Sequence, residues 1–219
     1  MKTLRTLVAG LAVALVASPV AAQDVSPVTL TAGGAVSYNG TTVGPYQARF
    51  GSDPGAPSVD VFCIDYVHQI QVGQTFNANL TNLASGNLSL TRGGDAALAQ
   101  YQQMAWLTTK FDGATNDQTR AIQTAIWHVM TPGTPGAIGG AFGTQYWLDQ
   151  AASNYLTSGL DYSTFAIITD VNFMQGGRQE LLTRVPTTVT PEPGTYLLMA
   201  TGLAGVGMIA RRRKATAAV

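Results

Sequence analysis

Charge is scarce in this 219-residue chain, in which Asp, Glu, Lys and Arg together make up 11% of the residues, against an average near 25%. The formal net charge is zero, but basic residues concentrate at the two ends. Between residues 23 and 190, eleven acidic side chains face only six basic ones, a net charge of about −5. Those six are Arg49, Arg92, Lys110, Arg120, Arg178 and Arg184. With no basic surface to neutralise phosphates, the composition argues against nucleic-acid binding.

Cysteine and histidine are also rare, with one cysteine, Cys63, and two histidines, His68 and His128. A single cysteine forms no internal disulfide, and these three residues have no metal-ligand spacing, so neither a metal nor another cofactor is expected. An unpaired cysteine in an exported protein is explained by intermolecular pairing, by a reactive thiol or by a buried structural thiol. Three aspartates could contribute to a calcium site but do not follow the EF-hand pattern: Asp53, Asp60 and Asp65.

The first 22 residues are typical of a secretory signal peptide. They combine a basic start, with Lys2 and Arg5, an apolar stretch over residues 7–16 and a small-residue cleavage site at residues 20–22. The apolar stretch is short for a bilayer span, which favours a signal over a membrane anchor. The sequence therefore predicts export.

The C-terminus carries a second targeting segment. Pro191, Glu192 and Pro193 are followed by an apolar stretch over residues 196–210 and by a basic cluster at residues 211–214. The apolar stretch is slightly shorter than the roughly 20 residues of a spanning helix. The basic cluster behind it would hold the end of the chain in the cytoplasm, which predicts a transmembrane helix with the preceding domain outside.

This arrangement resembles the PEP-CTERM sorting signal of Gram-negative bacteria, over residues 191–214. The resemblance implies that residues 187–219 are a sorting signal, recognised by an exosortase-type membrane protease and cleaved near the Pro-Glu-Pro motif. It also implies a protein that is anchored transiently in the inner membrane and then delivered to the outer surface or the extracellular matrix, as in a biofilm. A plain C-terminal anchor is the alternative.

Residues 23–186 form the domain between these signals, and their pattern predicts an α+β fold with a β-rich core, a sandwich or a barrel. Residues 59–72 are the strongest strand pattern, and both of its faces are apolar near Cys63, which predicts an inner strand. Closing strands are expected over residues 165–171 and 180–185.

A helical segment is expected inside this β-rich core. The first helix is predicted over residues 95–110, with Asp95 as its N-cap. Thr115 and Gln118 fit a capping box at the start of a second helix, which Pro132 ends. A third helix is expected after the Gly/Pro-rich loop that follows.

The second predicted helix contains Ile122-Gln123-Thr124-Ala125-Ile126-Trp127, in which Gln123 and Trp127 lie one turn apart. A carboxamide beside an apolar stripe is either buried and hydrogen-bonded or reactive. If this helix packs across the strand of Cys63, the thiol and the Gln123 carboxamide meet in a dry pocket. Contact gives an effective molarity that reaches ~10⁵–10⁸ M, enough for the thiol to displace ammonia and form an internal thioester. Exclusion of water would then protect that thioester.

Two motifs resemble those of bacterial surface thioester domains, the TQXA-type adhesin domains. Phe62-Cys63-Ile64-Asp65 is similar to their aromatic-Cys-hydrophobic motif, and the Gln123 segment to their hydrophobic-Gln-x-x-hydrophobic-Trp motif. The resemblance spans roughly residues 59–130. It implies a Cys63–Gln123 thioester through which a surface or matrix adhesion protein attaches covalently to an amine or hydroxyl on a partner protein or polysaccharide.

In this hypothesis three apolar side chains, Phe62, Ile126 and Trp127, shield the bond. Each site reacts once, so the protein is not expected to be a turnover enzyme. The alternative is a non-covalent extracellular matrix or polysaccharide-binding protein with a buried, unreactive cysteine.

A cysteine hydrolase would need a histidine at the thiol. On a regular strand His68 points away from Cys63, and His128 lies about 140° around its helix from Gln123. Neither histidine is therefore well placed for a hydrolase, although one of them could still act as the base that forms the thiolate.

Overall fold

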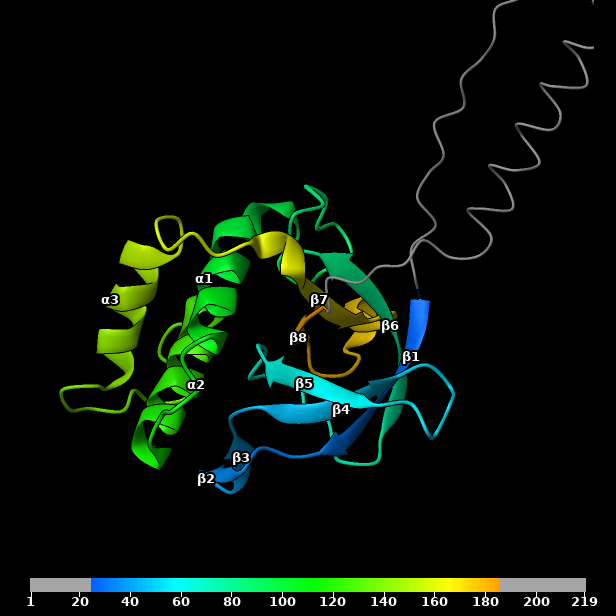
Figure 1. Ribbon diagram of the computed structural model, residues 1–219, viewed down its shortest axis with the longest axis horizontal. Helices are drawn as coiled ribbons and strands as arrows, with labels where there is room; N and C mark the ends of the chain where they lie inside the picture. The colour runs from blue at the N-terminus through cyan, green and yellow to red at the C-terminus, as the bar shows by residue number, and fades with distance from the viewer. Residues whose placement is uncertain (1–24, 186–219) are drawn as a thin grey trace, which may run out of the picture.

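The computed structural model describes residues 25–185, so the predicted signal peptide and sorting helix lie outside the described residues. Six strands form a closed antiparallel barrel in the order β1-β4-β5-β8-β7-β6 (Figure 1). These strands are β1 (Val25–Ala32), β4 (Tyr46–Phe50), β5 (Ser58–Cys63), β6 (Thr75–Asn82), β7 (Phe165–Asp170) and β8 (Leu181–Arg184). The prediction of a β-rich core is confirmed, and the core is a barrel rather than a sandwich.

A separate two-stranded sheet joins β2 (Val36–Tyr38) to β3 (Thr41–Val43). Its two-residue turn is Asn39-Gly40, and both residues have positive φ angles, 47° and 80°. Asn-Gly is the preferred sequence for such a turn because both residues tolerate the left-handed region.

Three helices, α1 (Leu98–Thr108), α2 (Asn116–Met130) and α3 (Thr144–Asn154), lie together on one side of the barrel (Figure 1). They are inserted between β6 and β7 in the chain. No helix within residues 25–185 has the length and apolar character needed to cross a membrane.

The barrel interior and its helix-covered outer face hold separate hydrophobic clusters. Val61 and Cys63 of β5 belong to the interior cluster, whereas Phe62 and Ile64 belong to the cluster under the helices. Successive side chains of a strand point to opposite faces, so β5 contributes to both clusters. This explains why both faces of the strand are apolar around Cys63.

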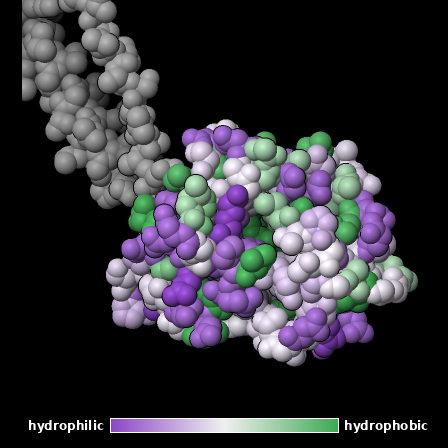
Figure 2. Space-filling view, turned by 180° about the vertical axis from the view of Figure 1, so that it is seen from behind, coloured by the Kyte–Doolittle hydropathy of each residue, from purple (hydrophilic) through white to green (hydrophobic). Residues whose placement is uncertain are grey.

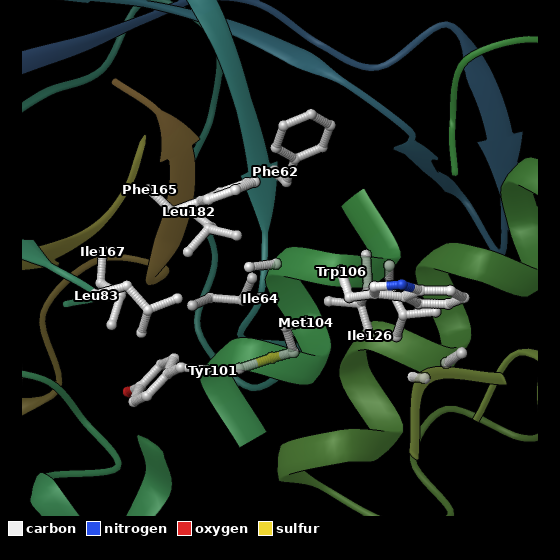
Figure 3. Packing of buried hydrophobic residues seen from close by; sticks show 14 of the residues in the cluster. Phe62, Ile64, Leu83, Tyr101, Met104, Trp106, Ile126, Phe165, Ile167 and Leu182 are labelled. Carbon is white, nitrogen blue, oxygen red and sulfur yellow. The ribbon is translucent and has the colours of Figure 1, made fainter. Parts of the chain in front are cut away.

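Side chains of the barrel wall and of the helices interlock in the outer cluster (Figure 3). Phe165, Ile167 and Leu182 of β7 and β8 share the cluster with Met104 of α1 and Ile126 of α2. Burial of such apolar side chains contributes about 1.5–3 kcal/mol each, which makes this contact the main attachment of the helices to the barrel.

The capping box predicted for the second helix is confirmed. The Thr115 hydroxyl accepts a hydrogen bond from the Gln118 backbone N–H (3.3 Å), and the Gln118 side chain accepts one from the Thr115 backbone N–H (2.9 Å). The helix ends at Met130, two residues before Pro132. The closing strands also form at their predicted places, as β7 and β8.

Two predictions of local structure are wrong. The strand expected over residues 59–72 ends at Cys63, because Asp65 starts a turn in which its carboxylate accepts the backbone N–H groups of Val67 (2.9 Å) and His68 (3.3 Å). Asp95 is not the N-cap of α1 but begins a 3₁₀ turn before it, with its carboxylate bonded to a backbone N–H of the preceding loop. Both carboxylates bond to loop N–H groups, a competition with regular structure that is common for aspartate.

Candidate functional site

Cys63 lies at the end of β5, where it pairs with Leu181 of β8. Its side chain packs in the interior cluster of the barrel and is fully buried. The loop after Cys63 and the segment before Leu181 therefore meet around the thiol.

Gln123 lies in α2 and is also fully buried. Its Nε2 donates a hydrogen bond to the backbone carbonyl oxygen of Cys63, at 2.7 Å. Its Oε1 is buried and has no hydrogen-bond partner among the described residues. The structure thus brings Gln123 to Cys63, and the contact runs through the main-chain carbonyl of the cysteine.

The Cys63 thiol itself bonds to a second carboxamide. Its Sγ donates to Oε1 of Gln179 at 3.1 Å, and Nε2 of Gln179 donates to the backbone carbonyl of Asp65 at 2.6 Å. Gln179 is buried and lies two residues before β8. Sequence reasoning missed it, although a polar Gln-Glu pair directly before an apolar closing strand was a visible signal.

Tyr46 of β4 also lies against the thiol. Burial raises the pKa of the Cys63 thiol to about 12, and the nearby Tyr46 hydroxyl, which donates to the Thr42 backbone carbonyl, opposes this shift. Burial likewise raises the pKa of Tyr46, and the neighbouring Cys63 adds to that effect. At neutral pH both groups are therefore protonated, and the resting cysteine is a thiol rather than a thiolate.

A pocket of about 430 Å³ adjoins these residues. Tyr46, Gln179 and Trp127 line it together with the loop after Cys63 and the sheet of β2 and β3. Tyr66 of that loop lies beside Trp127, with 4.9 Å between ring centroids. The fully buried thiol does not line the pocket itself, and its neighbours Tyr46 and Gln179 separate the two.

The three residues predicted to shield the site are all buried, but on different sides. Phe62 and Ile126 belong to the outer cluster, where Phe62 stacks on Phe111 at 5.5 Å. Trp127 belongs to a small cluster with Val36 and Val43, and it lines the pocket. Of the three, only Trp127 lines the pocket, and it lies on α2, the helix that also carries Gln123.

Both histidines have other partners. Nδ1 of His68 lies 2.6 Å from the Asp65 carboxylate, and Nε2 of His128 bonds to the backbone carbonyl of Pro135. Among residues 25–185 no hydrogen bond joins either histidine to Cys63. Neither histidine is therefore placed next to the thiol, where it would have to lie to act as the base that forms the Cys63 thiolate.

A buried carboxylate stabilises the segment that carries Gln179. Glu180 is 2% exposed and accepts hydrogen bonds from the Tyr101 hydroxyl (2.8 Å), the Thr169 hydroxyl (2.7 Å) and the Arg92 backbone N–H (2.9 Å). Burial raises the pKa of Glu180, while these three donors oppose the shift. The donors therefore anchor the chain directly beside Gln179.

Arg92 connects the two segments that meet at the site. Its Nε lies 3.1 Å from the Asp65 carboxylate, and its Nη2 donates to the backbone carbonyl of Arg178 at 2.8 Å. One guanidinium thus holds the loop after β5 against the segment before β8, as its fixed fork of donors allows.

Within the described part of the chain, no group of three or more His, Cys, Asp or Glu side chains comes together as a metal site would require. The three aspartates considered for calcium, Asp53, Asp60 and Asp65, therefore do not come together in such a group.

Comparison with known proteins identifies the C-terminal segment. A family model described as the PEP-CTERM protein-sorting motif matches residues 189–214. The motif implies an exported protein that an exosortase processes, transiently anchored in the membrane and then associated with the surface. No curated protein and no solved structure matches the chain.

Proposed function

We propose that this exported protein forms an internal thioester between Cys63 and Gln123 and uses it to attach covalently to a nucleophile on a partner surface. The observation that carries the proposal is the contact of two fully buried residues, with the Gln123 amide 2.7 Å from the Cys63 carbonyl oxygen. Oε1 of Gln123, which has no hydrogen-bond partner among residues 25–185, supports it, because a buried polar atom without a hydrogen bond is costly and needs a reason.

Bond formation is balanced within the site. The Cys63 sulfur adds to the side-chain carbonyl carbon of Gln123, the carbon–nitrogen bond breaks, and ammonia leaves with the thiol proton. In attachment, an amine or hydroxyl attacks the same carbon, the carbon–sulfur bond breaks, and the sulfur takes up the proton of the nucleophile. Neither step needs an oxidant or a second reactant from the protein.

The raised pKa of Cys63 makes the first step slow, because little thiolate exists at neutral pH. A bond that forms once in the life of the protein tolerates a slow step, and proximity compensates in part. The thiol must also leave its hydrogen bond to Gln179 before it reaches Gln123.

A second function is favoured by the raised pKa of the Cys63 thiol and by its hydrogen bond to Gln179. A protonated thiol that is fully buried and hydrogen-bonded to Gln179 is what a structural cysteine requires. The protein would then be a non-covalent matrix or polysaccharide-binding protein.

The two proposed functions predict different intact masses for the protein. For the exported protein, the thioester predicts an intact mass short by one ammonia, a cross-link that maps to Cys63 and Gln123, and a mass gain on addition of methylamine. Gln123→Glu keeps the shape of the side chain but removes the ammonia leaving group, so it should restore a titratable thiol. A full mass and a free thiol in the unsubstituted protein would establish the structural cysteine instead.

A further inference from the structure

The pocket beside Cys63 is lined by uncharged side chains. Its volume of about 430 Å³ is within the range of small-ligand sites. None of the described residues that line it is charged, and the polar ones are hydroxyl and carboxamide side chains, among them Ser37, Thr41, Gln69, Gln71 and Gln179. Such groups donate and accept hydrogen bonds equally, which suits a ligand rich in hydroxyls.

The charged groups near this pocket are already paired with one another. Asp65 faces both Arg92 (3.1 Å) and His68 (2.6 Å), so its charge is compensated inside the protein. An ammonium, carboxylate or phosphate entering the pocket would lose its hydration without gaining a counter-charge, which is unfavourable. The lining therefore selects against ionic ligands.

The aromatic wall supplies the complementary apolar surface. Tyr66, which is half-buried, and Trp127 form this wall, with 4.9 Å between their ring centroids. Trp127 is 2% exposed, and its Nε1 has no hydrogen-bond partner among the described residues. Because this N–H is itself buried, the wall presents to the pocket mainly the half-exposed ring of Tyr66.

We infer that this pocket binds a neutral saccharide. The C–H faces of a sugar ring pack on the aromatic wall, and its hydroxyls bond to the carboxamides and hydroxyls around it. On the face of the molecule shown in Figure 2, hydrophilic and hydrophobic residues are interspersed.

The pocket also gives the bound sugar a place in the proposed attachment, and this part rests on the proposed function. Tyr46 and Gln179 line the pocket and both contact the Cys63 thiol. Cys63 and Gln123 lie behind this lining and are fully buried, so the Gln179 contact must open before a bound sugar hydroxyl reaches the acyl carbon of Gln123. The hydroxyl would then attack that carbon, so that an ester forms, the carbon–sulfur bond breaks and the hydroxyl proton passes to sulfur.

The test measures reversible binding to the full chain by tryptophan fluorescence and calorimetry. The probes are neutral oligosaccharides (glucose, galactose and mannose oligomers), an acidic uronate oligomer and a cationic glucosamine oligomer. We expect saturable binding of at least one neutral probe and little binding of the charged ones. Failure of every neutral probe to bind at millimolar concentration, or binding of the charged probes alone, would overturn the inference.

Variants locate the binding in this pocket. Tyr66→Ala should weaken neutral-probe binding about tenfold or more, by loss of the aromatic wall. Tyr38→Ala is the matched control, because Tyr38 also packs near Trp127 (6.4 Å) but does not line the pocket, and it should leave binding within about twofold. Gln71→Glu should weaken the neutral probe and favour the cationic one. Equal effects of Tyr66→Ala and Tyr38→Ala would contradict the assignment.

The intact mass, measured on the same samples, separates this inference from the proposed function. Reversible sugar binding without a methylamine adduct would support the saccharide site and overturn the thioester. A methylamine adduct without sugar binding would support the thioester and overturn the saccharide site.

Discussion

At the scale of single residues, the environment of Cys63 is set by two carboxamides that make different contacts. Gln123 bonds to its main-chain carbonyl, while Gln179 accepts the hydrogen bond of its thiol. Gln179 also bonds to the carbonyl of Asp65 and so links the loop after β5 to the segment before β8. We expect this residue to be important for stability as well as for the orientation of the thiol.

Replacing Gln179 with alanine should therefore destabilise the protein by about 1–3 kcal/mol, because the Asp65 carbonyl is left without its donor. Urea unfolding monitored by circular dichroism measures the change. Gln145→Ala is the control, since Gln145 is exposed on α3 and bonds only to a side chain of its own helix. Equal destabilisation by both substitutions would refute the structural role of Gln179.

Glu180 predicts a pH dependence of stability. Burial raises its folded pKa above the ordinary value of 4.5, so its contribution is fully present below that value and is lost as the pH rises above it. Glu180→Gln removes the titration while it keeps most of the hydrogen bonds. As the pH rises from 4 towards neutrality, the free energy of unfolding of the variant should therefore increase relative to that of the unsubstituted protein.

Urea unfolding at a series of pH values tests this expectation. Asp112→Asn, which replaces an exposed carboxylate, is the control. Parallel curves for the unsubstituted protein and Glu180→Gln would show that the three donors, rather than burial, control the carboxylate.

At the scale of elements, the sequence predicted the parts of the fold that depend on local chemistry. The capping box of α2 and the strands β7 and β8 appear where the pattern indicated. The prediction failed after Cys63, where the alternating pattern continues but the chain turns at Asp65. Alternation describes which side chains are apolar, whereas a strand also needs a partner, and the β5–β8 pairing ends at Cys63.

The cap of α2 also matters for the site, because this helix carries Gln123. Thr115→Ala removes the side-chain acceptor of the capping box and should cost about 1 kcal/mol of stability, within a range of 0.5–2. Thermal unfolding measures it, with the exposed Thr157→Ala as the control. An unchanged midpoint for Thr115→Ala would mean that packing against the barrel alone determines where the helix begins.

At the scale of the whole molecule, the sorting motif and the barrel domain have separate tasks. The motif at residues 189–214 directs an exported chain to processing and to the surface. The barrel with its helices, in residues 25–185, carries the candidate site. A change in the motif should therefore alter the location of the protein and leave the fold around Cys63 unchanged.

Glu192→Ala should prevent processing by the exosortase, so that the larger precursor accumulates in the inner membrane. Membrane fractionation and the apparent size on an immunoblot measure this, with Thr195→Ala as a control in the same segment but outside the Pro-Glu-Pro motif. Normal size and surface delivery of Glu192→Ala would show that another feature of the segment is recognised.

The sequence by itself determined the sorting motif, the capped helix of Gln123 and the strand of Cys63, because each depends on residues close together in the chain. Only the tertiary structure decided that the six strands close into a barrel and that the Cys63 side chain points into it. It also decided that Gln179, 116 residues further along, accepts the hydrogen bond of the thiol. The physical reason is that strand pairing and side-chain burial join distant segments, and no local pattern in the chain specifies which segments will meet.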